Sequence, residues 1–92
     1  MVRLTVLVID DERTTMRSTR TAILARGHKT FEADSLELAE FWLSRTSIDR
    51  VFVEPAMLGE SGGAWLEAVH TRQPWIRSAV ITRLGDEELR DT

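Results

Sequence analysis

Leu4-Thr5-Val6-Leu7-Val8-Ile9 is an apolar run rich in β-branched residues, and Asp10-Asp11-Glu12 follows it directly. A run of this composition is typical of a strand buried on both faces of a parallel sheet. A second, shorter run, Val51-Phe52-Val53, ends at Glu54. Because the carboxyl ends of parallel strands meet at one edge of a sheet, these acids are expected to lie together. The pattern predicts a site for a divalent cation and a phosphoryl group.

The rest of the chain alternates between expected helices and strands. The first helix is expected from Arg13 to Arg26, and Gly27 follows where left-handed backbone commonly ends a helix. Asp34 and Glu37 have the spacing of a capping box and predict the start of a second helix. The other expected elements are strands at residues 29–33, 51–53 and 78–82, and helices at residues 64–71 and from residue 85 onwards. This alternation predicts one α/β domain with a doubly wound parallel sheet.

The composition limits the classes of function. The 92 residues include 12 Lys and Arg and 15 Asp and Glu, for a net charge of -3, and no cysteine. A mildly acidic chain without a basic run gives no electrostatic reason to expect a nucleic-acid partner. The lack of cysteine excludes disulfides and thiolate sites. The N-terminus is too short for a signal peptide and no apolar stretch approaches membrane-spanning length, so we expect a soluble cytoplasmic protein without a membrane partner.

The stretch from Val6 to Glu12 resembles the start of a response-regulator receiver domain. The similarity covers nearly the whole chain, through Gly27-His28, Ala33-Asp34-Ser35, Asp49 to Glu54, Met57, Gly59, Gly62 and the strand ending at Thr82. The acidic pair and the spacing from Asp49 to Gly62 make it fairly specific. It implies a flavodoxin-like fold with ligand chemistry at the carboxyl ends of the strands. It also implies an aspartate that accepts a phosphoryl group from a histidine kinase, an acidic pair that holds magnesium, and a Thr or Ser switch.

Carried over by position, the resemblance assigns a metal site to Asp10, Asp11, Glu54 and the carbonyl of Ala56. Mg²⁺ is the cofactor that this oxygen-donor set implies. The resemblance also puts Glu54 at the phosphoacceptor position, where the family has aspartate. Like charges this close are expected to raise the pKa of at least one carboxyl when no cation is bound.

Several other positions match or depart from the family pattern. Thr82 matches the switch hydroxyl. Arg83 follows it where a small residue is common, so the bulky, positively charged arginine side chain is expected over the pocket. Leu58 stands where proline is usual, and Pro55 is an unusual neighbour of the phosphoacceptor position. The fifth strand of the family, its paired lysine and its last helix have no counterpart, which makes the expected fold a truncated one of about four strands with flanking helices.

The additional methylene of Glu54 is expected to impair phosphoryl transfer. It moves the carboxylate oxygen by roughly 1 to 1.5 Å, about one carbon–carbon bond. Misplacements of that size cost on the order of 10²-fold in rate. We therefore expect little or no phosphorylation at Glu54, whose longer carboxylate would instead partly mimic a phosphoryl oxygen.

The matched part of the family fold leaves the fourth strand at an edge of the sheet, with Val80 and Ile81 unpaired on one side. An apolar edge favours pairing with another chain. Either two copies form a symmetric dimer, or the chain is a piece of a longer protein, and the sequence leaves both open. We expect a homodimer in contact through the fourth strand or the terminal helix.

Three functions are consistent with these residues. The leading interpretation is an atypical, non-enzymatic receiver that regulates by binding a signalling protein, such as a histidine kinase or a phosphotransfer protein. The second is a working phosphorelay receiver that accepts phosphate on Asp10, Asp11 or, inefficiently, Glu54. The third is a small Mg²⁺-dependent phosphatase, since the first strand and its acids are similar to the haloacid dehalogenase motif. Glu12 is the wrong residue for that motif, and the chain lacks room for the later ones.

Simpler explanations also exist for several of these residues. Three acids in succession are typical of a helix N-terminus, the glutamate at the phosphoacceptor position could face solvent, and the switch threonine suits a strand end in any case. We expect His28 and His70 on the surface and Trp42 and Trp65 in helix packing. Trp75, between Pro74 and Ile76, is a better candidate for a contact surface.

Overall fold

The fold is that of a computed structural model, which describes residues 2–59 and 62–81. Strands and helices alternate along these residues, as the sequence predicts. The elements are β1 (Thr5–Ile9), α1 (Arg13–Ala25), β2 (Lys29–Ala33), α2 (Leu36–Arg45), β3 (Arg50–Val53), the short 3₁₀ helix η1 (Pro55–Met57), α3 (Gly62–Arg72) and β4 (Arg77–Val80).

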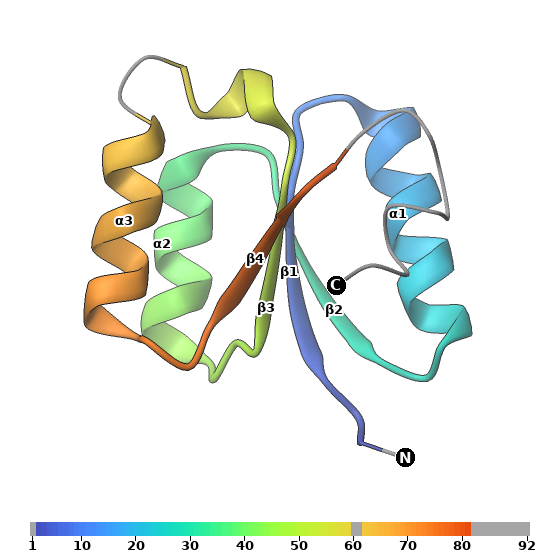
Figure 1. Cartoon of the computed structure of the whole chain (residues 1–92). Helices are drawn as coiled ribbons and strands as arrows, with labels where there is room; N and C mark the ends of the chain where they lie inside the picture. Colours follow the sequence, from blue (N-terminus) through green and yellow to red (C-terminus); the bar gives the residue numbers. More distant parts are fainter. Residues whose placement is uncertain (1, 60–61, 82–92) are drawn as a thin grey trace.

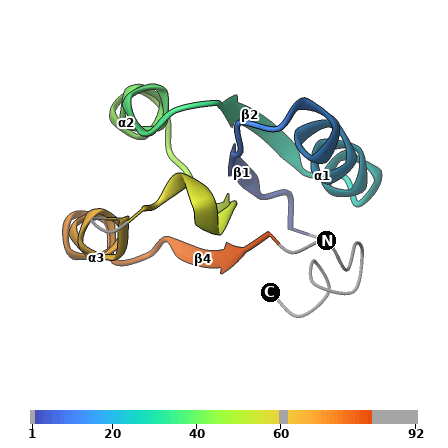
Figure 2. The same ribbon diagram turned by 90° about the horizontal axis from the view of Figure 1, so that it is seen from above.

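The four strands form one parallel sheet in the order β2-β1-β3-β4. Helix α1 covers one face of the sheet, and α2 and α3 cover the other (Figure 1, Figure 2). The predicted doubly wound parallel sheet is therefore confirmed, with four strands and flanking helices in the described part of the chain. None of the described helices is both long and apolar enough to cross a membrane.

Alternate residues of β1 supply two separate hydrophobic cores. Leu7 and Ile9 belong to the core under α2 and α3, whereas Val6 and Val8 belong to the core under α1. Both sides of the strand are buried because helices cover both faces of the sheet. This explains why the strand reads as a continuous apolar run rather than as an alternation of apolar and polar residues.

The capping side chain at the start of α2 differs from the sequence prediction. The Ser35 hydroxyl, and not Asp34, caps α2 by accepting the N–H of Leu38 at 3.1 Å, and the helix begins at Leu36. Glu12 caps α1 with both carboxylate oxygens. A side-chain oxygen at this position satisfies N–H groups that have no partner within the helix. The sequence thus predicted the start of α2 correctly but named the wrong capping residue.

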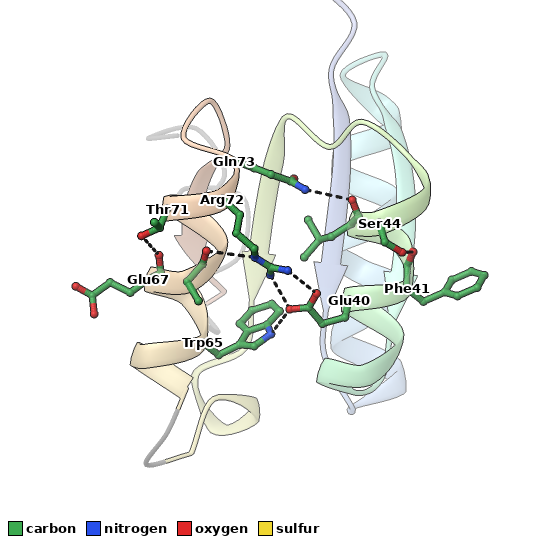
Figure 3. A network of polar contacts seen from close by, with 10 residues as sticks. Glu40, Phe41, Ser44, Trp65, Glu67, Thr71, Arg72 and Gln73 are labelled. Carbon is green, nitrogen blue, oxygen red and sulfur yellow. Dashed lines mark hydrogen bonds and ion pairs between the residues drawn. The ribbon is translucent and has the colours of Figure 1, made fainter.

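Helices α2 and α3 are joined by polar contacts around one carboxylate, shown in Figure 3. Glu40 of α2 accepts the indole N–H of Trp65 at 2.8 Å and two N–H groups of the Arg72 guanidinium at 2.8 and 3.3 Å. Trp42, on the same helix as Glu40, donates its indole N–H to the carbonyl of Glu32 at 2.9 Å. Both tryptophans also pack against the core under α2 and α3. Their predicted role in helix packing is confirmed.

Both histidines are only partly exposed, rather than fully on the surface. His28 is half-buried, and its Nδ1 atom accepts the backbone N–H of Leu4 at 3.0 Å. Nothing in the sequence connects two residues 24 positions apart, so this contact could not be anticipated. His70 is half-buried as well, and its Nε2 atom has no hydrogen-bond partner in the described structure.

The boundaries of the last elements shift by one or two residues. Helix α3 begins at Gly62 rather than Ala64, and β4 covers residues 77–80 rather than 78–82. Val80 lies on the outer strand with 47% of its surface exposed, whereas Ile81 is buried in the core under α1. The N–H of Ile81 continues the pairing by donating to the carbonyl of Val53 at 2.8 Å. The helix expected from residue 85 lies outside the described residues.

Candidate functional site

The carboxyl ends of β1 and β3 lie next to each other in the sheet. Ile9 pairs with Val53, and the N–H of Glu54 donates to the carbonyl of Ile9 at 2.9 Å. Asp10 and Glu54 therefore leave the sheet side by side at its carboxyl edge. They line a pocket of about 190 Å³, and the other lining residues are Asp11, Glu12, Thr15, Ala56 and Ile81. All four residues assigned to the metal site thus line one pocket, as the strand ends predict.

Asp10 is the buried acid of this pocket, with 1% of its surface exposed. Its Oδ1 atom accepts the N–H of Glu12 at 2.9 Å, whereas its Oδ2 atom is buried without a partner in the described structure. Burial raises the pKa of Asp10 above its usual value, and the nearby carboxylates of Glu54, Asp11 and Glu12 raise it further. The predicted rise in a carboxyl pKa is therefore present, but burial of the Asp10 carboxyl contributes more to it than repulsion from the neighbouring carboxylates.

Glu54 is held by its own loop. Its Oε2 atom accepts the N–H of Ala56 at 2.7 Å, which makes Glu54 the cap of η1. Pro55 occupies the first position of that 3₁₀ helix, where its missing N–H costs nothing. The side chain is half-buried and lines the pocket, so it neither faces open solvent nor reaches into the pocket with both oxygens unengaged.

Glu12 has a different environment from the two acids before it. Its carboxylate accepts the N–H groups of Thr14 and Thr15 at 3.1 and 2.9 Å and the hydroxyl of Thr15 at 2.6 Å. These bonds favour the charged form, so the pKa of Glu12 is lowered to about 2. The helix-terminus explanation of the acidic cluster therefore applies to Glu12. Thr15 was missed as a pocket residue, although it lies three positions after Glu12, the spacing at which a capping side chain meets the helix backbone.

The donor chemistry of the pocket suits Mg²⁺, but the donors are not gathered around one point. Oxygen ligands are the ones that Mg²⁺ prefers, and the unpartnered Oδ2 atom of Asp10 offers one. Asp11 is exposed, and one oxygen of Glu54 is engaged by Ala56. Among residues 2–59 and 62–81, no three His, Cys, Asp or Glu side chains lie close enough together to hold a metal.

The two predicted switch residues, Thr82 and Arg83, lie outside the described residues. The residue before them does reach the site, since Ile81 is buried and lines the pocket. It adds an apolar side chain to a lining that contains four acids. Sequence reasoning placed Ile81 on an open strand edge and did not assign it to the pocket.

Comparisons with known proteins find likenesses only among solved structures, since no protein-family model and no curated protein matches the chain. The structure of a response regulator from Thermotoga maritima superposes with a TM-score of 0.79 at 27% identity, covering 98% of this chain and 75% of that one. A response regulator receiver domain protein from Clostridium thermocellum gives a TM-score of 0.72 at 26% identity, covering 94% and 70%. The beryllofluoride-activated NtrC4 receiver domain dimer gives 0.74 at 23% identity, covering 89% and 68%.

These structures share the parallel sheet and the flanking helices along nearly the whole of this chain. The acids of the pocket stand at the ends of β1 and β3, the edge at which flavodoxin-like folds place their ligand chemistry. The chain is a response-regulator receiver domain of two-component signalling.

Proposed function

We propose that this receiver domain is atypical and signals by binding a protein partner, with little or no phosphorylation at Glu54. The observation that carries the proposal is the hydrogen bond of 2.7 Å between the Glu54 carboxylate and the N–H of Ala56. A carboxylate that attacks a phosphoryl group must present an oxygen in line with the bond that breaks. Glu54 has one methylene more than aspartate, and one of its two oxygens is engaged by its own loop.

The proposal includes Mg²⁺ as a ligand of the pocket rather than as part of a phosphorylation reaction. Asp10 and Asp11 would hold the ion, with Glu54 and the carbonyl of Ala56 as the further oxygen donors. A bound cation would neutralise the carboxylates that crowd this edge of the sheet. We propose no enzymatic role, and hydrolysis of a generic phosphate ester that is lost in Asp10→Asn would contradict this.

Glu54 is expected to remain unmodified when the protein is incubated with acetyl phosphate and Mg²⁺. Intact-mass measurement then shows no stable gain of a phosphoryl group, because the longer side chain misplaces the attacking oxygen. Glu54→Asp is expected to recover modification only in part, since the rest of the pocket is unchanged. Glu54→Gln provides the control for modification elsewhere.

A stable phosphoryl gain on the wild-type chain would favour a working phosphorelay receiver instead. If Glu54→Gln abolished that gain, Glu54 would be the acceptor. If the gain persisted in Glu54→Gln, peptide mass mapping would show whether Asp10 or Asp11 carries the phosphoryl group, since substituting either residue would also remove a proposed Mg²⁺ ligand. A histidine kinase or a phosphotransfer protein then becomes the phosphoryl donor, whereas under our proposal such a protein is a binding partner. The proposal also includes the cytoplasmic location expected from the sequence.

A homodimer in contact through β4 is expected in solution. Val80 on this strand is 47% exposed and Trp75 just before it is 56% exposed, and apolar edges favour pairing with another chain. Light scattering coupled to gel filtration at several concentrations measures the mass directly. A mass of one chain throughout the micromolar range would contradict the dimer, and Val80→Lys should shift a dimer towards monomer without affecting the core.

A further inference from the structure

The end of the sheet opposite the pocket is strongly basic. All four strands begin at this end, which is formed by residues 2–5, 26–29, 45–50 and 72–77 and is called the amino edge below (Figure 1). The amino edge holds seven basic residues and one acid, a net charge of +6, although the whole chain has a net charge of -3. The seven basic residues are Arg3, Arg26, Lys29, Arg45, Arg50, Arg72 and Arg77.

Four of these basic residues mark the starts of the four strands. Lys29, Arg50 and Arg77 are the first residues of β2, β3 and β4, and Arg3 lies two positions before β1. Consecutive members of this set are between 21 and 27 positions apart, so the sequence shows no basic run. The parallel sheet brings them to one end of the molecule because all its strands start there.

The other three basic residues of the amino edge serve the fold itself. Helix C-termini carry a partial negative charge that favours bases, and Arg45 and Arg72 are the last residues of α2 and α3. Arg72 also pairs with Glu40, and Arg26 donates to the carbonyl of Ala22 at 3.1 Å. This explanation does not extend to the bases at the strand starts, because β-sheets have only small net dipoles.

Most of the positive charge at the amino edge is not neutralised by the fold. Arg72 is the one basic residue of this edge that forms an ion pair within residues 2–59 and 62–81. Arg3 and Arg77 are exposed. Asp49, the acid of this edge, is engaged by the backbone, since its Oδ2 atom accepts the N–H of Thr5 at 2.8 Å. The charge of the edge is therefore available to something outside the chain.

Two exposed apolar side chains lie at the same edge. Val2 is 74% exposed, and Trp75 is 56% exposed between Pro74 and the buried Ile76. Tryptophan is enriched where membranes meet water, because its ring is apolar and its N–H is polar. The amino edge thus combines unneutralised positive charge with apolar side chains that could enter a lipid headgroup region.

We infer that the amino edge is a contact surface for an anionic membrane. Anionic lipids attract basic residues near the bilayer surface, and apolar side chains strengthen such contacts. The bases begin four adjacent strands about 4.8 Å apart, with further bases at the helix ends on both faces, and a membrane offers negative charge over a plane that meets all of them. The cytoplasmic leaflet is the anionic one, which agrees with the cytoplasmic location proposed above.

The carboxyl edge of the sheet orients the domain on such a surface. Residues 10–12, 34–35 and 54–59, which follow the first three strands, hold five acids and no base. Anionic lipids repel these acids, so the pocket faces away from the membrane and stays accessible to a protein partner. The inference is therefore independent of the proposed function. The expectation of no membrane partner came from the lack of a spanning stretch, which surface contact does not need.

The backbone at the amino edge disfavours nucleic acid as the polyanion. Phosphate groups are commonly bound by backbone N–H groups at helix N-termini, whereas the C-termini of α1, α2 and α3 lie at this edge. The N–H groups of Leu4 and Thr5 before and at the start of β1 are already bonded to His28 and Asp49. Close phosphate contacts with the backbone are therefore disfavoured, but the attraction of long arginine side chains to a charged surface remains.

Vesicle co-sedimentation of the whole chain tests the inference. The chain is expected to bind vesicles that contain phosphatidylserine, to bind them more weakly as salt increases, and not to bind vesicles of phosphatidylcholine alone. Arg3→Glu combined with Arg77→Glu should weaken binding about tenfold or more, since it removes two attractions and adds two repulsions. Trp75→Gln should weaken it about fivefold at unchanged charge. Brominated lipids should quench part of the tryptophan emission of the wild-type chain and none of it in Trp75→Gln.

A second double variant controls for total charge. Arg13→Glu combined with Arg17→Glu changes the net charge by the same amount at exposed positions in the first half of α1, away from the amino edge, and should change binding less than about twofold. Equal losses in the two double variants would overturn the inference, as would equal binding to both kinds of vesicle or binding to neither at low salt. Tighter binding of duplex DNA or of a polyglutamate peptide than of the vesicles, at equal salt, would assign the edge to nucleic acid or to an acidic protein instead.

Discussion

Asp10→Asn is expected to stabilise the domain against unfolding by about 1–3 kcal/mol at pH 7 when a chelator removes divalent cations. The Asp10 carboxylate is buried, its Oδ2 atom has no hydrogen-bond partner, and its neighbours in the pocket are acids. Folding therefore removes a charge from water, and the one hydrogen bond from the Glu12 N–H compensates for this only in part. Asparagine keeps the oxygen that accepts the N–H of Glu12 but carries no charge. Urea unfolding followed by circular dichroism measures the difference.

The stabilisation by Asp10→Asn is expected to depend on pH. The pKa of Asp10 is raised in the folded protein above its usual value of 3.8, so the folded state binds the proton more tightly than the unfolded state. The stability of the wild-type chain therefore falls as pH rises from 3.8 through the folded pKa. The advantage of Asp10→Asn is complete above that pKa and shrinks as pH falls towards 3.8. An advantage that grew at acidic pH would contradict burial as the cause.

Glu12→Gln, two residues away, is expected to have the opposite effect on stability. The pKa of Glu12 is lowered from 4.5 to about 2 by its bonds to Thr14 and Thr15. Its contribution to stability is therefore present above pH 4.5 and is lost as pH falls through about 2. Removing this charge should destabilise the protein at neutral pH. Under the proposal that Mg²⁺ binds at Asp10, adding Mg²⁺ would stabilise the wild-type chain more than Asp10→Asn.

Gly62→Ala is expected to destabilise the domain by about 1–3 kcal/mol, the usual cost of forcing an additional group into a packed site. Gly62 is buried at the start of α3, and a Cβ atom placed there would overlap the Cβ of Leu58. That atom lies next to the backbone and cannot move aside as the end of a flexible side chain could. The substitution therefore pushes α3 away from η1, the element that Glu54 caps.

Gly63→Ala is the matched control for this prediction. It changes the same helix at the next position, but a Cβ atom there meets nothing within 4 Å. Alanine in place of glycine within a helix is favourable by roughly 0.5–1 kcal/mol, so Gly63→Ala should stabilise the protein. Urea denaturation of the two variants side by side separates steric overlap from helix propensity. Equal effects of the same sign would show that close packing at Gly62 does not matter.

The sequence was sufficient to predict the sheet and the place of the pocket because both follow from long patterns. Two apolar runs that end in acids determine which strands are buried and where their carboxyl ends lie. The roles of the individual acids could not be predicted in this way. Asp10 and Asp11 are adjacent in sequence, yet the first is buried and the second is exposed. This difference depends on how the chain turns as it leaves the sheet, because both residues line the pocket.

Local hydrogen bonds account for the remaining errors. Ser35 and Asp34 are both good capping residues, and Ser35 is the cap because α2 begins directly after it at Leu36. The bond between Glu54 and Ala56 depends on a side-chain rotamer that the spacing of residues does not specify. His28 accepts a hydrogen bond from Leu4, a contact that exists only once β1 and β2 are paired.

The parallel pairing of β1 with β3 has a consequence for the order of folding. Two parallel neighbours cannot be joined by a tight turn, and here the connection passes through α1, β2 and α2. The acids at the two strand ends are therefore distant in the nascent chain and meet only when a nonlocal contact closes, which is a slow kind of step. Their mutual repulsion opposes that same step. A chain synthesised only up to the end of α2 contains β1 and its acids but not β3. The binding pocket therefore forms only when β3 docks against β1.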